Sequence, residues 1–398
     1  MNKTCDVLVI GAGSAGIAAA VAAARAGMQT CLLEKTGVPG GIAARLHLGT
    51  ICGLYRLDDT GNPSFINEGL SAEWATRLMR RDDMQTPRLM GRVYVLPYRS
   101  PTYRSLAGEM LAAEKYCSAI YSAQLRGIMV RNGSIRTVTY VHSGNTETIA
   151  PGMVIDCSGD AIVSTYAHCG IIEPDTAKQV PAAVVPVYRA EGRPITTADM
   201  TRVRLMLHRG IQAGHLPPVL QDMAVISTGD SSIFTIKLNI GKAIKHYCHS
   251  ENMSLPQAVE KMMALFLMYL QKNMKECGGC MARFDQLAIA HRTGKRVMGK
   301  YMLTREDVLS GKKFAQAAAK GCWPIERWGD NGIGTLEYLP DGEYYEIPYD
   351  ALQSAEIDNL LSGGKCISAD EDALASVRVI GTCLATGAAA GKYAAERI

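Results

Sequence analysis

The sequence has no long uninterrupted apolar run and little excess of charge of either sign. Its most apolar long stretch, residues 258–270, is interrupted by Glu260 and Lys261 and is too short to span a bilayer, so we predict a buried helix there. The net charge of +4 is small and scattered, which argues against a nucleic-acid partner. With 20% charged and 47% apolar residues, the composition favours a soluble globular protein with no membrane or nucleic-acid partner.

A secretory leader is also missing. Residues 1–5 run directly into an apolar strand and leave no room for a charged region, an apolar region and a cleavage site. We therefore expect a cytoplasmic protein with its twelve cysteines reduced. Only Cys277 and Cys280 have a spacing that redox or metal chemistry often uses, and no second such pair accompanies them. Their role is open between that chemistry and a flexible loop, and we predict no metal site.

The sequence does contain a glycine-rich turn between an apolar strand and an alanine-rich helix. The run DVLVIGAGSAG ends in GxGxxG at Gly16, and a helix is predicted over 17–26. Gly11 permits the tight turn, Gly13 lets the backbone approach a pyrophosphate, and Gly16 lets helix and strand pack closely. Ser14 and Ala15 begin the helix, where free N–H groups face the phosphates.

An acid follows at the expected distance. A second apolar run, Cys31-Leu32-Leu33, ends on Glu34, whose carboxylate can accept hydrogen bonds from a ribose. A glycine-rich turn by itself is weak evidence, but here a strand precedes it, a helix follows it and the acid completes it. Together they indicate a site for the ADP half of a dinucleotide.

The rest of the chain predicts two domains, one of them discontinuous. A glycine-rich loop at 36–55 is followed by helices at 67–79 and 105–116 and by a hairpin that turns at Asn132-Gly133. The strand at 153–156 ends in a small-residue turn with two carboxylates, Asp156 and Asp160, which puts that turn at the ligand-binding edge of a parallel sheet. Segment 171–335 has no second GxGxxG and is predicted to be the substrate or cap domain. A small-residue helix at 381–395, suited to close packing, ends the chain.

Several of these motifs together resemble one family. GAGSAG with Glu34, then Gly40-Gly41, IDCSGD at 155–160 and NLLSGGKCISADEDALASVRVIGTC near the end look like the FAD-dependent oxidoreductases of the glutathione-reductase-like Rossmann group. The phrase YMLTREDVLSGKKF at 301–314 is similar to the YxLTxxDVLxGxxF element of a bacterial branch. Two stretches depart from the family pattern: RTGKR at 292–296 replaces R-E-S-R-R, and SGGK at 362–365 replaces Ala-Gly-Arg.

The resemblance implies an α/β fold, with a Rossmann-type FAD-binding domain formed by 1–170 and 336–398. Residues 55–105 would be an insertion near the active site, and 171–335 a discontinuous second domain that serves as the substrate or cap domain. FAD would lie extended along the sheet edge and contact a set of residues spread over the chain. These residues are Gly11, Gly13, Ser14, Ala15, Gly16, Glu34, Lys35, Gly40, Gly41, Ala43, Leu125, Ser158, Gly159, Asp160, Asp370, Val377 and Arg378.

Within that set the resemblance implies different roles. Ala43 would begin a segment beside the isoalloxazine, Leu125 would meet adenine through its backbone, and Asp370 or its neighbours would meet the ribityl chain. Ser376-Val377-Arg378 would begin the last helix, whose dipole stabilises negative charge on the reduced flavin.

Catalytic candidates must lie in segments that reach the flavin ring. His47 follows the Gly-Gly turn and has a side chain suited to proton transfer, although a packed loop histidine fits its position equally well. Arg378 can bind an anionic substrate or stabilise the flavin anion, and Arg292 and Arg296 can reach from the second domain to bind a carboxylate; each can equally serve as a structural ion-pair partner. A covalent link to flavin through His47 also stays open.

We predict an FAD-dependent oxidoreductase that transfers a hydride between a small organic substrate and flavin N5. The absence of a second dinucleotide motif and of a Cys-x4-Cys pair argues against a thioredoxin-reductase-type enzyme. The alternatives are a flavin monooxygenase or oxidase, and an FAD-carrying electron-transfer subunit that works with a partner protein. Substrate identity and homo-oligomer formation are left open.

Overall fold

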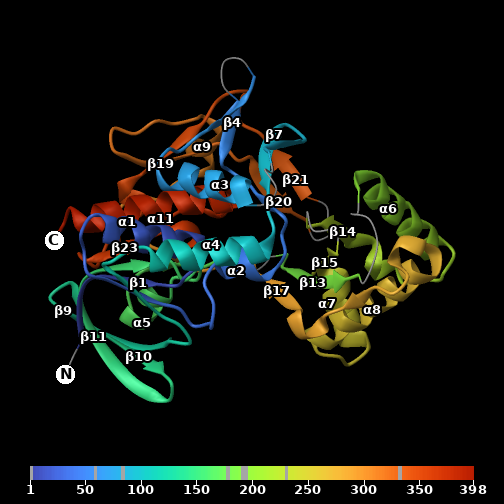
Figure 1. The fold of residues 1–398 in the computed structure, drawn as a ribbon, viewed down its shortest axis with the longest axis horizontal. Coiled ribbons are helices and arrows are strands. Elements are labelled where there is room, and N and C mark those ends of the chain that lie inside the picture. The colour runs from blue at the N-terminus through green and yellow to red at the C-terminus, as the bar shows by residue number, and fades with distance from the viewer. Residues whose placement is uncertain are drawn as a thin grey trace.

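The computed structural model describes residues 3–57, 61–81, 86–175, 180–189, 196–228, 232–329 and 334–398. Parts of the predicted insertion at 55–105 and of the predicted substrate domain at 171–335 therefore lie outside the described residues. The structure has a mixed main sheet with helices α1 and α11 running over it, and a smaller antiparallel sheet with its own helices to one side (Figure 1).

The main sheet brings the carboxyl ends of five parallel strands to one edge. Its order is β8-β2-β1-β11, with β23 also paired to β11. Ile10 is level with Leu33 and Asp156, and Asp156 is level with Ser362. The turns after these strands therefore meet, although they lie far apart in the sequence. The strands are β1 (Lys3–Ile10), β2 (Thr30–Leu33), β8 (Cys117–Ile120), β11 (Asn145–Asp156) and β23 (Leu360–Ser362).

Two small-residue helices pack on this sheet with unusually close backbones. They are α1 (Ser14–Arg25) and α11 (Ile380–Ala395). A Cβ atom on Gly387 would lie 2.1 Å from the carbonyl oxygen of Ala15, and one on Gly391 would lie 2.2 Å from that of Ala19. Larger residues at these positions would push the helices apart, which explains the abundance of alanine and glycine in both. The predicted close packing of the C-terminal helix is confirmed, and its neighbour is α1.

The predicted hairpin is also confirmed. Strands β9 (Gln124–Arg131) and β10 (Ser134–His142) pair antiparallel and turn at Asn132 and Gly133. Both turn residues have positive φ, 53° and 70°, as the tight hairpin turns require. Helix α5 (Ile162–Ala167) follows β11.

The glycine-rich segment after β2 is less irregular than the sequence suggested. It contains the short helix α2 (Gly41–Arg45), which begins after Gly40, a residue in the left-handed region at φ 100°. A further group of elements then precedes the hairpin, with both predicted helices shifted by a few residues. These elements are β3 (Thr50–Ile51), β4 (Tyr55–Leu57), β5 (Pro63–Phe65), α3 (Leu70–Arg81), β6 (Arg88–Met90), β7 (Val93–Pro97) and α4 (Ser100–Ala112).

The second sheet has its own hydrophobic core. It is antiparallel, in the order β14-β15-β13-β16, with β17 also paired to β13. The buried residues of this core all fall between 183 and 280, within the segment predicted as the substrate domain. The boundaries of that domain stay a prediction. The elements are β13 (Ala182–Tyr188), α6 (Thr197–Gln212), β14 (Met223–Ser227), β15 (Ile233–Asn239), α7 (Lys242–Ser250), α8 (Leu255–Asn273), β16 (Met281–Ala282) and β17 (Ala288–Ala290).

Helix α8 confirms the buried helix predicted at 258–270. One face of it, including Met262, Phe266 and Leu270, is buried in the core of the second sheet, while Met268 on the other face is exposed. Within the described residues, no helix by itself has the length and apolar character needed to cross a membrane; α10 and α11 pass that test only together, with a 94° bend between them.

The chain returns to the first sheet through short paired strands and ends on two helices. These elements are β12 (Ile171–Ile172), which pairs with β18 (Arg296–Val297), then α9 (Arg305–Leu309), β19 (Ala317–Gly321), β20 (Ile325–Trp328), β21 (Gly334–Glu337), β22 (Tyr345–Pro348) and α10 (Glu371–Val377). The prediction that Ser376-Val377-Arg378 begins the last helix is wrong. Val377 ends α10, Arg378 is its C-cap, and α11 starts at Ile380 because Val379 is extended, with ψ 153°.

Candidate functional site

The turn between β1 and α1 is too crowded for side chains at two of its three motif glycines. Gly11 has φ 98°, and a Cβ there would lie 2.7 Å from the carbonyl oxygen of Cys157. A Cβ on Gly16 would lie 1.7 Å from the carbonyl oxygen of Gly11. Glycine is therefore required at both positions by backbone packing, as the motif predicted.

Gly13 differs from the other two because it faces open space. A Cβ at Gly13 would have no atom within 4 Å, and its φ of −75° suits any residue. No side chain caps α1, which begins at the next residue, so the N–H groups of its first turn face the same space. An uncrowded, uncapped helix start beside a glycine fits an anionic pyrophosphate.

Glu34 keeps room for one more hydrogen bond. The side chain is 7% exposed; Oε2 accepts from the Ala12 N–H at 2.7 Å, and Oε1 accepts from the N–H and the hydroxyl of Thr36 at 2.7 and 2.8 Å. A carboxylate offers about four acceptor positions, so Oε2 has one left. A ribose hydroxyl can fill it, which supports the predicted role of Glu34.

This geometry gives a testable result for Glu34. We expect Glu34→Gln to weaken FAD binding by roughly tenfold, because the hydrogen bonds lose their charge. We also expect a lower melting temperature, since Ala12 and Thr36 lose a charged acceptor. Equilibrium titration of the apoprotein with FAD measures the affinity. The control is Glu147→Gln, because Glu147 lies near the start of β11 and therefore far from the edge where the strands end. Equal FAD affinities in the two variants would contradict the ribose role of Glu34.

The turn after β11 is organised by buried hydrogen bonds. Asp156 Oδ1 accepts from the N–H and the hydroxyl of Ser158 at 2.9 and 2.6 Å, and the thiol sulfur of Cys366 accepts from the Gly159 N–H at 3.0 Å. Burial raises the pKa of both Asp156 and Cys366. The turn is thereby fixed at the same sheet edge as Gly11.

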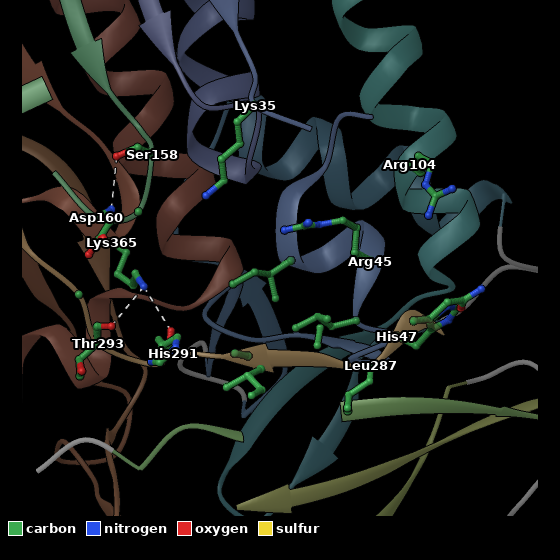
Figure 2. Close-up of a pocket in the computed structure, with 18 of the residues that line it drawn as sticks. Lys35, Arg45, His47, Arg104, Ser158, Asp160, Leu287, His291, Thr293 and Lys365 are labelled. Carbon is green, nitrogen blue, oxygen red and sulfur yellow. Dashed lines mark hydrogen bonds between the residues drawn. The ribbon is translucent and has the colours of Figure 1, made fainter. Parts of the chain in front are cut away.

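A cavity of about 980 Å³ opens from this edge toward the second sheet. Lys35, Ser158, Gly159, Asp160 and Lys365 line one part of it, and Arg45, His47 and Arg104 line another (Figure 2). Residues 285–291, which include β17, contribute Leu287, Ile289 and His291. Five lysines and arginines but only two aspartates line the cavity, a balance that favours a ligand carrying phosphates.

Lys365, which follows β23 of the main sheet, contacts the segment that follows β17 of the second sheet across this cavity. Its ammonium donates to the carbonyl oxygens of His291 and Thr293 at 3.2 and 3.4 Å (Figure 2). Burial lowers the pKa of this lysine. A Cβ on Gly294 would meet the Asp160 carboxylate at 2.9 Å, so the segment after β17 packs directly on the turn after β11.

The three predicted catalytic residues have different surroundings. His47 lines the cavity; it is 8% exposed and has a left-handed backbone with φ 47°. Its carbonyl oxygen accepts from the Thr235 hydroxyl on β15 at 3.3 Å, which links it to the second sheet. Arg378 lies at the bend between α10 and α11 and donates to the Glu326 carbonyl oxygen at 3.2 Å. Arg296 is outside the cavity, where it pairs with Glu371 at 2.7 Å.

The remaining predicted cofactor residues are held mainly by backbone hydrogen bonds, by helix capping or by burial. The carbonyl oxygen of Ala43 accepts from the hydroxyls of Tyr98 and Ser100, both at 2.9 Å. Leu125 is buried on β9, two residues after Ala123, whose N–H donates to the Glu34 carbonyl oxygen. Asp370 caps α10 by accepting from the Ala373 N–H, and Val377 is buried at the end of that helix. Their cofactor contacts stay predictions.

Sequence reasoning missed part of the cavity wall. Arg45 and Arg104 were not singled out, although Arg45 lies in the segment predicted to run beside the flavin. His291 and the β17 residues had no motif to reveal them, since only the pairing of β17 with β13 brings them to the cavity. Lys365 was visible only as a departure from the family pattern.

Cys277 and Cys280 lie away from this cavity. Both are free thiols buried in the core of the second sheet. A hydrogen bond with Cys280, together with burial, raises the pKa of Cys277. Among the described residues, no group of three or more metal-ligating side chains is close enough to hold an ion.

Comparison with solved structures shows the fold. The flavin-dependent brominase Bmp2 is similar with a TM-score of 0.50 and 12% identity, over 99% of this chain and 79% of that one. A geranylgeranyl bacteriochlorophyll reductase-like protein from Thermoplasma acidophilum has a TM-score of 0.47 and 11% identity, over 100% of this chain and 78% of that one.

Comparison with sequences shows the family. A probable electron transfer flavoprotein-quinone oxidoreductase, YgcN of Escherichia coli (strain K12), is 50% identical over 40 residues, so the match spans 10% of this chain and 10% of that relative. The family model described as FAD dependent oxidoreductase matches residues 6–398, nearly the whole chain. These matches agree with the strand-edge turns, the uncapped helix start and the spare acceptor on Glu34. The chain belongs to the family of FAD-dependent oxidoreductases.

Proposed function

We propose that this enzyme transfers a hydride between a small organic substrate and FAD, with the reaction taking place in the cavity between the two sheets. The observation that carries the proposal is the composition of that cavity wall. One part comes from the dinucleotide-binding edge, and the other comes from β17 and its flanking residues in the second sheet. When bound, FAD supplies a ring that accepts or donates a hydride equivalent.

The chain's own contribution is to position the substrate and to move a proton. Arg45 and His47 are the titratable residues of 43–48 that line the cavity, and the backbone of His47 is tied to the second sheet through Thr235. A histidine at such a position can take a proton from, or return one to, the substrate atom beside the reacting carbon. Apolar side chains nearby, including Ile42, Leu46 and Leu287, limit water in this part of the cavity.

A substitution at His47 tests this role. We expect His47→Asn to slow flavin reduction by substrate about a hundredfold, the lower range for loss of a general acid or base, with FAD content unchanged. Asparagine tolerates the left-handed backbone of this position. The measurement is anaerobic stopped-flow absorbance of the flavin. The matched control is His168→Asn, an exposed histidine with φ 54° outside the cavity; equal rates in both variants would make His47 a packing residue.

The same instrument tests the reaction class. The oxidised enzyme is mixed anaerobically with sets of alcohols, amines and organic acids, and then with oxygen. Reduction by a substrate followed by slow reaction with oxygen supports the proposal. Rapid oxygen consumption coupled to substrate would favour a monooxygenase or oxidase instead, and a flavin reduced only through a partner protein would favour an electron-transfer subunit.

A further inference from the structure

Two cations from the second sheet lie against a single indole ring. The Lys237 ammonium is 4.1 Å from the centroid of the Trp328 ring, and the Arg292 guanidinium carbon is 4.5 Å from it. Lys237 is on β15 and Arg292 follows β17, whereas Trp328 ends β20. The second sheet thus delivers two positive charges to one place on the part of the chain that returns to the main sheet.

A third cation belongs to the same group. Arg378 is linked to Trp328 through Glu326, whose carboxylate accepts from the Trp328 indole N–H at 2.8 Å. Burial lowers the pKa of both Lys237 and Arg292, and the charge of Arg378 lowers both pKa values further. Its Nη2 donates to the backbone oxygen of Glu326, while its Nε is buried with no hydrogen-bond partner. We call Lys237, Arg292 and Arg378 the cation cluster.

Among the residues that the structure describes, carboxylates near the cation cluster do not balance its positive charge. Glu326 is the acid that interacts with all three cations, and its carboxylate accepts instead from the indole N–H groups of Trp328 at 2.8 Å and Trp323 at 3.2 Å. Among the described residues, no ion pair joins any member of the cluster to a carboxylate. Within the described part of the chain, the three positive charges face the carboxylate of Glu326, and Glu371, which also acts on Arg378, is already paired with Arg296.

Without a bound anion, this excess of positive charge destabilises the charged forms of Lys237 and Arg292. Burial and the charge of Arg292 lower the pKa of Lys237 to about 8, and burial and the charge of Arg378 lower that of Arg292 to about 10. A group whose charged form is disfavoured in the unliganded protein gains stabilisation when an anion binds beside it. Arg292 is already held in place by hydrogen bonds to Val180 and Asn239, so the site is partly preorganised.

The cation cluster lies next to the wall of the cavity proposed for the reaction, although its three side chains are not among the lining residues. Arg292 stands between His291 and Thr293, both of which line the cavity. The charge of Arg378 also lowers the pKa of Lys365, whose ammonium holds those two residues. Other basic residues, including Lys35 and Arg45, line the cavity itself, so the predicted FAD phosphates have basic partners outside the cluster.

We propose that the cation cluster binds the carboxylate of an organic-acid substrate and so orients it at the mouth of the FAD cavity. This inference rests on the proposed function and names its substrate class. Lys237 supplies the ammonium that lies over the Trp328 ring, and Arg378 supplies its buried Nε–H, which has no hydrogen-bond partner among the described residues.

The test is calorimetric titration of the FAD-loaded enzyme with benzoate and acetate, and with benzamide and acetamide as uncharged controls. We expect at least one carboxylate to bind and its amide not to bind. Lys237→Met should weaken carboxylate binding roughly tenfold to a hundredfold, and Lys237→Arg should restore most of it. The matched control, Lys245→Met, changes an exposed lysine on α7 and should have no effect.

The pH dependence provides a second readout. Because Lys237 loses its proton around pH 8 in the unliganded protein, carboxylate affinity should fall between about pH 7 and about pH 9. Arg292, Arg378 and Glu326 act electrostatically on Lys237, and the decline should be smaller in Lys237→Arg because a guanidinium holds its proton more tightly than an ammonium.

Three results would overturn the inference: equal binding of carboxylates and amides, no binding of either carboxylate, or unchanged binding in Lys237→Met. A loss of FAD in Lys237→Met, measured by the absorbance of the same samples, would assign the cluster to the cofactor and also overturn it. The proposed function fails by a different result: the enzyme binds carboxylates through Lys237, but no tested donor reduces its flavin.

Discussion

Gly13→Leu is expected to give a folded protein that contains almost no FAD. The backbone at Gly13 has φ −75° and ψ −177°, which leucine adopts without strain. No atom of the chain lies within 4 Å of a Cβ at this position, so the fold tolerates the side chain. The leucine would instead fill the space in front of the α1 N-terminus, where the motif predicts the pyrophosphate.

The measurement is the ratio of flavin to protein absorbance, with circular dichroism to show that the fold is retained. Gly108→Leu is the matched control, because Gly108 also has no atom within 4 Å of its Cβ but lies on α4, away from the turn. Gly16→Ala provides the contrast: its Cβ would lie 1.7 Å from a backbone oxygen, so this variant should fail to fold. Full FAD content in Gly13→Leu would show that the pyrophosphate lies elsewhere.

Arg296→Met is expected to lower the free energy of unfolding by about 3 kcal/mol, near the lower end for breaking a buried ion pair. The Arg296 side chain is 2% exposed and contacts Glu371 at 2.7 Å, while the carboxylate of Glu371 is 16% exposed. Without the arginine, Glu371 would keep a largely buried charge at the start of α10. Methionine fills a similar volume, so the lost charge dominates the effect.

Urea denaturation of the FAD-loaded protein measures this free energy. The control is Arg327→Met, which breaks a pair with Asp372 on the same helix, where the arginine is 40% exposed. An exposed pair of this kind contributes less than about 1 kcal/mol, so the two variants should differ clearly. If Arg296→Met were as stable as Arg327→Met but had a much lower turnover, the catalytic role predicted for Arg296 would replace the structural one.

The sequence predicts those features of the structure that depend on residues close together along the chain. The turn from Gly11 to Gly16, the spacing to Glu34 and the hairpin at Asn132-Gly133 are local features, and the structure confirms each of them. The end of α10 was not predictable in the same way. The sequence runs without proline or a helix-breaking residue from Ser376 to Ile380, yet α10 and α11 meet there at 94°.

The sequence by itself determined the Rossmann-type strand, turn and helix, the acid at the end of β2 that holds this turn, and membership of the FAD-dependent oxidoreductases. These follow from short-range geometry, in which a few residues fix φ, hydrogen bonds and close backbone contacts. Only the tertiary structure decided that Lys237, Arg292 and Arg378 gather around Trp328 and Glu326. Lys237 and Arg378 are more than a hundred positions apart in the sequence, and only the tertiary fold brings them close together. No local sequence pattern predicts this arrangement.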